Sequence, residues 1–142
     1  MACFSKNNSR KSADVFVIRN ITRNTLIAKD PVILTSIIGH MIGLMFKHKI
    51  TPHVLLFKSE RYISLHTFFV SAPIDVIFVN NQGRVVEIKK NLTPFSFYSP
   101  RKKSACIIEA AAGTARSSKT KINDILHFPV KRLVPKYMQF ML

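Results

Sequence analysis

Residues 75–88 decide the fold, because they have the pattern of a complete β-hairpin: Asp75-Val-Ile-Phe-Val-Asn-Asn-Gln-Gly-Arg-Val-Val-Glu-Ile88. Two runs of mostly β-branched and apolar residues flank the loop Asn80-Asn-Gln-Gly83. A four-residue loop that ends in glycine is typical of a hairpin, since glycine accepts the positive φ that closes the turn. The stretch therefore predicts two antiparallel strands.

Runs of the same kind recur on both sides of this hairpin, with turn residues between them. Besides the hairpin strands at 74–79 and 84–90, they cover residues 15–19, 25–29, 54–58, 62–70, 105–110 and 124–128. Many short strands at close spacing are typical of antiparallel sandwiches and barrels. The sequence therefore predicts a mainly β fold, a small antiparallel β-sandwich or barrel.

The longest uncharged stretch, residues 32–46, predicts the one helix. Asp30 is a good N-cap residue, and Pro31 suits the first helical position. Apolar residues then recur at helical spacing, at positions 37, 38, 41, 44 and 45. We expect one short helix near residues 31–46, packed against the core. The stretch is shorter than the ~20 residues that a bilayer span needs, so no membrane span is expected.

Length and composition fit one folded domain. The 142 residues leave room for a single core, and the hydrophobic fraction of 47% is too high for a disordered chain despite a net charge of +15. We expect a disordered basic leader at residues 1–12, a single β domain at 13–128 and a C-terminal tail at 129–142.

The N-terminal residues and the cysteines bear on the compartment. Residues 1–14 contain no apolar run like the core of a signal peptide, which favours a cytoplasmic location. Cys3 lies in this polar leader and Cys106 in an apolar run. Two reduced thiols are therefore a simpler interpretation than a disulfide between them.

Four motifs along the chain resemble one protein family. They are Gly43-Leu-Met45, Phe68-Phe-Val-Ser-Ala-Pro-Ile-Asp-Val-Ile-Phe-Val79, Gly83-Arg-Val-Val86 and Ile108-Glu-Ala-Ala-Ala-Gly-Thr114. In this order they are similar to the motifs of domain of unknown function 192, also called uncharacterised protein family 0127, and above all to its archaeal branch. The resemblance runs from about residue 15 to 128. It implies a small β-sandwich or jelly roll with a short helix, and no established activity or cofactor.

One predicted strand carries a candidate ligand site. Along residues 62–70, Tyr62, Ser64, His66 and Phe68 would share one face. A few polar groups on an aromatic wall are typical of a small-molecule pocket. The alternative is that His66 is a half-buried strand residue bonded to a backbone carbonyl.

Two acids lie inside apolar strands, where a carboxylate is costly unless it is paired or hydrogen-bonded. Asp75 would either bind a hydroxyl or cation of a ligand, or accept backbone N–H bonds where its strand begins. A register with Val79 opposite Arg84 puts Asp75 and Glu87 on opposite faces, so they would form no acid–base pair. The other acid, Glu109, is expected to pair with a lysine or arginine.

The sequence contains no recognisable catalytic or metal-binding motif. It has no glycine-rich phosphate loop, no Gly-x-Ser-x-Gly and no Cys-x-x-Cys. His48 and His53 have no third metal ligand near them in the sequence. We therefore predict no catalytic residue, no metal and no cofactor, and we favour a protein that is not an enzyme.

Positive charge is concentrated in one part of the domain. Residues 13–128 carry a net charge of +9, and the stretch 84–121 has nine basic residues against two acids. These basic residues could form one rim that attracts nucleic acid or another anion in a salt-dependent way. The alternative is a solubilising surface. The nucleic-acid candidates are Arg101, Lys102, Lys103, Arg116, Lys119 and Lys121.

Two functional hypotheses follow. In the first, a non-enzymatic β-sandwich binds a small or anionic ligand in a cleft bordered by His66, Asp75 and the basic rim, with Tyr62 as a further ligand-binding candidate. In the second, the basic residues make it a nucleic-acid-associated protein. The sequence leaves the oligomeric state open.

Overall fold

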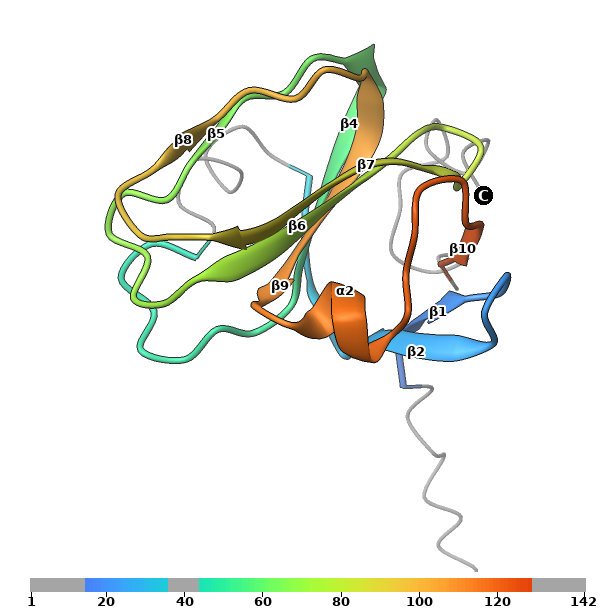
Figure 1. Cartoon of the computed structure of the whole chain (residues 1–142), viewed down its shortest axis with the longest axis horizontal. Helices are drawn as coiled ribbons and strands as arrows, with labels where there is room; N and C mark the ends of the chain where they lie inside the picture. Colours follow the sequence, from blue (N-terminus) through green and yellow to red (C-terminus); the bar gives the residue numbers. More distant parts are fainter. Residues whose placement is uncertain (1–14, 36–43, 129–142) are drawn as a thin grey trace, which may run out of the picture.

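The computed structural model of the chain describes residues 15–35 and 44–128. These residues are mainly β, as the strand pattern predicts, and contain one short helix (Figure 1). The elements are β1 (Val17–Asn20), β2 (Thr25–Lys29), β3 (Val32–Leu34), β4 (His53–Arg61), β5 (Leu65–His66), β6 (Ile74–Val79), β7 (Val85–Leu92), β8 (Phe97–Tyr98), β9 (Ser104–Ala111), α2 (Thr114–Ser117) and β10 (Leu126–His127).

A five-stranded sheet forms the centre of the fold, with the strand order β3-β4-β9-β6-β7. Its neighbouring strands are antiparallel except for β3 and β4, which are parallel. Every residue of β6 is buried. Continuous apolar runs such as β6 are typical of strands that are covered on both faces.

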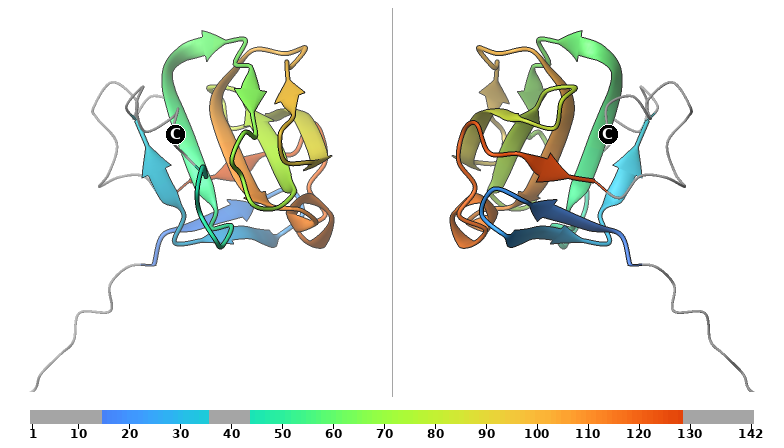
Figure 2. Two further views of the ribbon diagram at one scale, coloured as in Figure 1. Left: turned by 90° about the vertical axis from the view of Figure 1, so that its left-hand side faces the viewer. Right: turned by 90° about the vertical axis from the view of Figure 1, so that its right-hand side faces the viewer.

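Two small sheets cover the two faces of the central sheet (Figures 1 and 2). On one face, Ile77 and Val79 of β6 pack with residues of the β10-β1-β2 sheet, among them Ile18 and Leu126. On the other face, Val76 and Phe78 of β6 pack in a second apolar cluster that includes the start of β5. The result is a small β-sandwich in which the described strands close no barrel.

The hairpin prediction is confirmed, since β6 and β7 pair antiparallel across the 80–83 loop. Asn80 stabilises this loop, because its side-chain oxygen accepts hydrogen bonds from the backbone N–H of Gln82 at 3.0 Å and of Arg84 at 2.9 Å. Gly83 has a φ of +76°, and a Cβ there would lie 2.9 Å from the carbonyl oxygen of Leu126. Glycine is therefore required both for the turn and for this close approach.

The predicted register of the hairpin is wrong. Val79 pairs with Val85, and Phe78 pairs with Glu87, because irregularities interrupt the ladder. The residue expected opposite Val79, Arg84, instead bridges to Ile125. Asp75 and Glu87 still lie on opposite faces, since alternate residues of a strand point to opposite sides.

The predicted helix does not begin at Pro31. Residues Val32–Leu34 form β3, which runs parallel to the first residues of β4. Asp30 has a φ of 46°, so it turns the chain between β2 and β3 instead of capping a helix from the extended region. The middle of the predicted helix, residues 36–43, lies outside the described part of the chain.

The strand predicted at 62–70 is also wrong in its extent. Only Leu65 and His66 of that range belong to a strand, β5, which pairs with β8. The chain turns soon afterwards, where Phe69 has a φ of 61°. Nevertheless, the predicted alternation holds over 62–67, because Tyr62, Ser64 and His66 are exposed and Leu65 is buried.

Two further expectations concern the thiols and the membrane. Cys106 is a free, buried thiol, and burial raises its pKa far above the usual range. Cys3 lies outside the described residues. Among residues 15–35 and 44–128, no helix is long and apolar enough to cross a bilayer.

Candidate anion-binding pocket

Five basic side chains line one pocket of about 350 Å³. They come from three separate parts of the chain: the β1–β2 turn, the end of β7 and the segment around α2. Ala115 and Thr120 complete the lining. The basic residues of this pocket are Arg23, Lys90, Arg116, Lys119 and Lys121.

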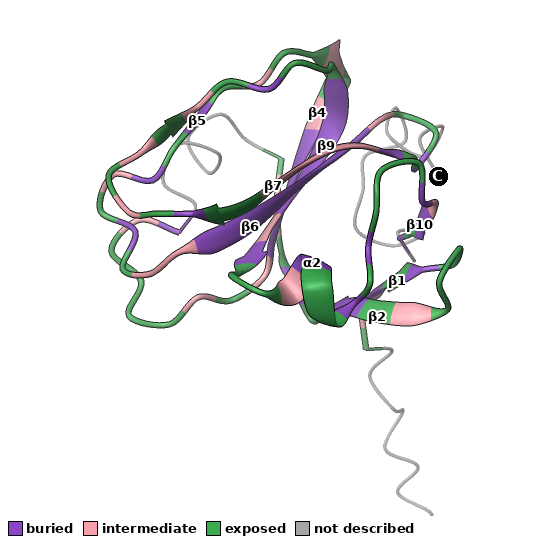
Figure 3. Ribbon diagram, in the orientation of Figure 1, coloured by how far each residue is buried: buried purple, intermediate pink, exposed green. Residues whose placement is uncertain are grey.

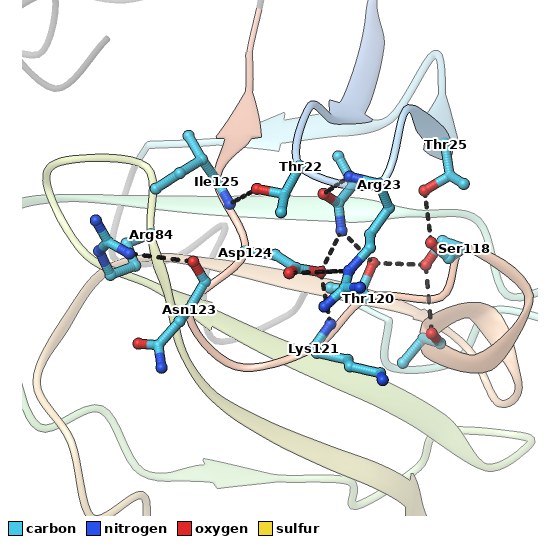
Figure 4. A network of polar contacts seen from close by, with 12 residues as sticks. Thr22, Arg23, Thr25, Arg84, Ser118, Thr120, Lys121, Asn123, Asp124 and Ile125 are labelled. Atoms are coloured by element: carbon cyan, nitrogen blue, oxygen red, sulfur yellow. Dashed lines mark hydrogen bonds and ion pairs between the residues drawn. The ribbon is translucent and has the colours of Figure 1, made fainter.

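A buried carboxylate, Asp124, joins two of these parts, the β1–β2 hairpin and the segment that follows α2 (Figure 4). It accepts hydrogen bonds from Asn20 Nδ2 at 2.7 Å, from Arg23 Nε at 3.1 Å and from the backbone N–H of Lys121 at 2.9 Å. Burial by itself would raise the pKa of Asp124, but the hydrogen bonds from Asn20, Arg23 and Lys121 lower it below its usual value. Asp124 therefore stays ionised and holds Arg23 at the pocket.

Hydroxyl groups extend this network beneath the wall of the pocket. The side chains of Ser118 and Thr120 bond to each other at 2.7 Å, and Asn20 Nδ2 also reaches Thr120 Oγ1 at 3.3 Å. From β2, Thr25 Oγ1 donates to the carbonyl oxygen of Ser118 (Figure 4). The α2 segment is thereby bound to the β1–β2 hairpin, about one hundred residues away in sequence.

Asp75 supports the same wall from within the core. Its Oδ1 accepts a hydrogen bond from the backbone N–H of Asn91 at 2.9 Å. Its Oδ2 accepts from the backbone N–H of Gly113 at 3.1 Å and of Ala115 at 2.9 Å. The carboxylate is thus occupied by backbone donors, the second of the two roles considered from the sequence, and it fixes the residue Ala115 that lines the pocket.

The backbone conformation of Lys119 is unusual for a side-chain-bearing residue. Its φ is 54°, in the left-handed region, which costs a non-glycine residue about 1–2 kcal/mol. Hydrogen bonds from Lys119 N to Arg116 O and from Thr120 N to Ala115 O, at 3.0 and 2.9 Å, hold this turn. Strained residues of this kind are frequent at ligand sites.

The positive charge of the pocket is mostly unneutralised. Arg23 uses its Nε for Asp124, and within the described part of the chain its terminal nitrogens make no hydrogen bond. None of the other four basic side chains forms an ion pair with a described acid. The pocket therefore presents five cations near one carboxylate that is already bonded.

The structure places the predicted ligand residues Tyr62, His66 and Asp75 in different surroundings. Asp75 is buried and accepts backbone hydrogen bonds at the start of α2. Tyr62 is exposed beneath Lys103 Nζ, which lies 5.7 Å from its ring centroid. His66 is exposed on β5, with its ring 5.1 Å from that of Phe68. Neither Tyr62 nor His66 lines the basic pocket.

The predicted basic rim is divided in the same way. Arg116, Lys119 and Lys121 line the pocket, whereas the loop that carries Arg101, Lys102 and Lys103 does not contribute to it. Sequence reasoning missed Arg23 and included Lys90 only as part of the basic stretch 84–121, since only the folded chain brings the β1–β2 turn and β7 beside α2.

The loop 99–103 is anchored by Glu87 instead. Its Oε2 accepts hydrogen bonds from the backbone N–H of Arg101 at 2.8 Å and of Lys102 at 3.0 Å. Its Oε1 accepts one from the hydroxyl of Tyr98. Burial and this contact with Glu87 raise the pKa of Tyr98 to about 12. The side chains of Arg101 and Lys102 remain exposed beside β8.

Glu109 forms no ion pair within residues 15–35 and 44–128, so the expected basic partner is not found there. It lies opposite His53 of β4 and Val76 of β6. Burial raises the pKa of Glu109 to about 7 and lowers that of His53, whose Nδ1 lies 2.7 Å from the carbonyl oxygen of Thr51. Over the described residues, no group of three or more potential ligands is placed to hold a metal ion.

Comparison with known sequences finds a family model, DUF192 (Uncharacterized ACR), that matches residues 34–128. A UPF0127 protein of Pyrococcus horikoshii is 36% identical over 94 residues, which are 65% of this chain and 81% of that protein. A UPF0127 protein of Pyrococcus furiosus is 28% identical over 111 residues, which are 77% of this chain and 95% of that protein.

Two solved structures share the fold. A Sinorhizobium meliloti protein, described as a candidate transcription regulator, superposes with a TM-score of 0.72 at 18% identity, over 80% of this chain and 92% of that one. A Novosphingobium aromaticivorans protein of unknown function gives a TM-score of 0.70 at 18% identity, over 80% of this chain and 83% of that one. At this identity the similarity concerns the fold.

Proposed function

We propose that the chain, which belongs to the DUF192 family together with UPF0127 proteins of two Pyrococcus species, binds a small anionic ligand in its basic pocket. The pocket would recognise a phosphate group of that ligand. The observation that carries this proposal is the convergence of five basic side chains on one pocket. A volume of about 350 Å³ lies within the range of small-molecule sites.

Arg23 is the residue best prepared to recognise a phosphate. Asp124 holds its Nε, so the planar guanidinium keeps a fixed orientation and leaves its terminal N–H groups for a second acceptor. Arginine donates to phosphate oxygens in pairs, whereas lysine acts as a movable point charge. We assign Arg23 the orienting contact, and Lys90, Arg116, Lys119 and Lys121 the neutralisation of the ligand charge.

Asp75 acts in this proposal as a positioning residue. Its hydrogen bonds to Gly113 N and Ala115 N fix the start of α2, from which Arg116 extends. The residues that line the pocket include no histidine, cysteine or carboxylate. We therefore propose binding at this site and assign it no catalytic step.

The test is a calorimetric titration of the whole chain with inorganic phosphate, pyrophosphate and a nucleoside diphosphate. The pocket variant carries Arg116→Gln and Lys119→Gln. The matched control carries Arg101→Gln and Lys102→Gln, which removes the same charge from exposed residues outside the pocket. We expect at least one of these ligands to bind, the pocket variant to bind it at least about tenfold more weakly and the control to bind it within about twofold.

Equal losses in the two variants would refute the proposal, since they would show attraction to net charge alone. Failure of all three ligands to bind would refute it as well. A polynucleotide is the other source of phosphate, so a single-stranded oligomer forms a further arm of the experiment. If the pocket variant binds the oligomer at least about tenfold more weakly but binds the three small ligands as wild type does, the pocket recognises the phosphates of a polymer, and the small ligand is overturned.

A further inference from the structure

A second exposed surface lies on the β5–β8 side of the fold, away from the basic pocket. Figure 3 draws β5 and the loops around it mostly as exposed or intermediate. Several large apolar side chains there face solvent: Phe46 is 70% exposed, Phe69 52%, and Phe95 and Phe97 each 68%. We call the following residues the aromatic surface: Phe46, His66, Phe68, Phe69, Phe95 and Phe97.

The rings of this surface contact one another in two groups. Phe69 stacks on Phe46, with centroids 5.0 Å apart and an interplanar angle of 20°, and meets Phe95 edge-on at 6.0 Å. In the other group, the ring of His66 lies 6.0 Å from that of Phe97. Phe68 contacts both rings of this pair, at 5.1 and 5.3 Å. The same two chain segments, 66–69 and 95–97, contribute to both groups.

Three of these phenylalanines have left-handed backbone conformations. The φ values are 58° for Phe46, 61° for Phe69 and 55° for Phe95. A bulky residue is a genuine outlier in this region, and such residues persist only where the surrounding structure holds them. Outliers of this kind cluster at ligand-binding sites.

Hydrogen bonds hold this strained arrangement. Phe46 N donates to Phe69 O at 2.9 Å, and Phe95 N donates to Thr67 O at 3.0 Å. The buried hydroxyl of Thr67 donates to Thr93 O at 2.6 Å and accepts from Ser96 N at 2.9 Å. The rings are therefore presented to solvent by a fixed framework, so little ordering is needed when a partner binds.

The charge around the aromatic surface selects the chemistry of the partner. The three segments that carry or adjoin it, residues 44–50, 62–73 and 91–103, contain no aspartate or glutamate. They contain five cations: Lys47, Lys49, Arg101, Lys102 and Lys103. A partner that has flat faces for the rings and negative charge for these cations fits both features.

We propose that the aromatic surface stacks the unpaired bases of a single-stranded nucleic acid, while Arg101, Lys102 and Lys103 contact its phosphates. Aromatic rings beside a basic groove are the usual means of binding single strands without sequence preference. The inference does not rest on the pocket around α2.

The test measures fluorescence anisotropy with a labelled oligouridylate of about fifteen nucleotides, against an abasic oligomer of equal length. The first variant carries Phe95→Asn and Phe97→Ser, since asparagine tolerates the left-handed conformation. Its matched control carries Ile21→Ser and Ile122→Ser, two exposed apolar residues elsewhere. We expect wild type and control to prefer the base-containing oligomer at least about tenfold, and the aromatic variant to lose this preference.

A second variant keeps the proposal falsifiable if the aromatic variant does not fold. Arg101→Gln with Lys102→Gln should retain the preference for bases but lower the slope of log affinity against log salt by about 1.4, from two lost phosphate contacts. The pocket variant, Arg116→Gln with Lys119→Gln, should keep the preference for bases. The two proposals therefore fail independently.

Three results would overturn the inference. The first is that wild type binds both oligomers equally, and the second is that it binds neither. The third is that the isoleucine control loses as much of the preference for bases as the aromatic variant does. In addition, the bases of a duplex are stacked inside it, so a duplex that competes as well as the single strand would exclude base stacking. If wild type shows no preference for bases and forms a dimer that the phenylalanine substitutions dissociate, the surface binds a second copy of the chain instead.

Discussion

Replacement of Asp75 by asparagine is the most direct test of how the α2 wall is held. The carboxylate is 2% exposed and accepts three backbone N–H bonds, from Asn91, Gly113 and Ala115. In its best orientation, an asparagine keeps its oxygen on Gly113 and Ala115 and turns its NH₂ group toward the N–H of Asn91. One buried donor then loses its partner, and two charge-assisted bonds become neutral.

The expected cost follows from these contacts. A buried donor without a partner costs about 1–3 kcal/mol, and a bond to a charged acceptor is about 1 kcal/mol stronger than one to a neutral acceptor. The Asp75→Asn variant should therefore lose about 3–5 kcal/mol of unfolding free energy. The anion affinity of the pocket should fall as well, because Ala115 lines it.

Urea unfolding followed by circular dichroism measures this loss as a shift of the midpoint at unchanged slope. Asp30→Asn is the matched control, because it removes the same charge from an exposed residue, and it should change the unfolding free energy by less than about 0.5 kcal/mol. If Asp75→Asn cost less than about 1 kcal/mol, the backbone N–H bonds would not be what holds α2, and the reasoning would be refuted.

Three further predictions concern titration and turns. The pKa of Glu109 is raised from 4.5 to about 7, so the folded state binds its proton more tightly than the unfolded state. Stability should fall as pH rises from about 4.5 to 7, and Glu109→Gln should abolish this fall and gain up to about 3 kcal/mol above pH 7 in urea titrations. The folded state lowers the pKa of Asp124, so the stability that its carboxylate adds is present above pH ~4 and is lost as the pH falls through the pKa of the folded state. Thermal melts of Asp124→Asn should no longer show this loss of stability in acid. Gly83→Ala should lower the unfolding free energy more than Gly113→Ala does. Both glycines have positive φ, but only at position 83 would a Cβ lie 2.9 Å from the carbonyl oxygen of Leu126. Equal unfolding free energies of the two variants in urea would contradict this prediction.

The parts of the fold that were predictable from sequence are those with local causes. The β6–β7 hairpin follows from the turn residues between Asn80 and Gly83, which need no distant partner. Strands β6 and β9 of the central sheet follow from apolar runs that are almost wholly buried, whereas β3 falls in the stretch that predicted a helix. Even so, the register could not be read from the loop alone, because irregularities in the ladder and the bridge of Arg84 to Ile125 displace it.

Local signals also have more than one structural meaning. Asp30-Pro31 is typical of a helix start, but here the same dipeptide turns the chain into β3, since pairing with β4 outweighs the local propensity. The continuity assumed for residues 62–70 ends at the left-handed Phe69. That turn leaves His66 in the aromatic surface and separates it from Asp75.

The basic pocket shows what composition can and cannot locate. Of the basic residues between 84 and 121, Lys90, Arg116, Lys119 and Lys121 line the pocket, whereas Arg101, Lys102 and Lys103 do not. Arg23 lies far from these lining residues in sequence and is held beside them by its bond to Asp124, which the sequence marks only as the first residue of a predicted strand. Long-range hydrogen bonds of this kind leave no periodic pattern in the sequence.

The reach of the Asp124 network has a practical consequence for domain boundaries. Asn20, Arg23 and Thr25 precede the family match at 34–128, yet they bond to Asp124, Thr120 and Ser118 inside it. A chain trimmed to the match would lose β1 and β2, expose one side of the apolar core and leave the Asp124 carboxylate without its cation. The unit that folds therefore begins before the unit that sequence similarity detects, and expression or deletion studies should retain the first hairpin.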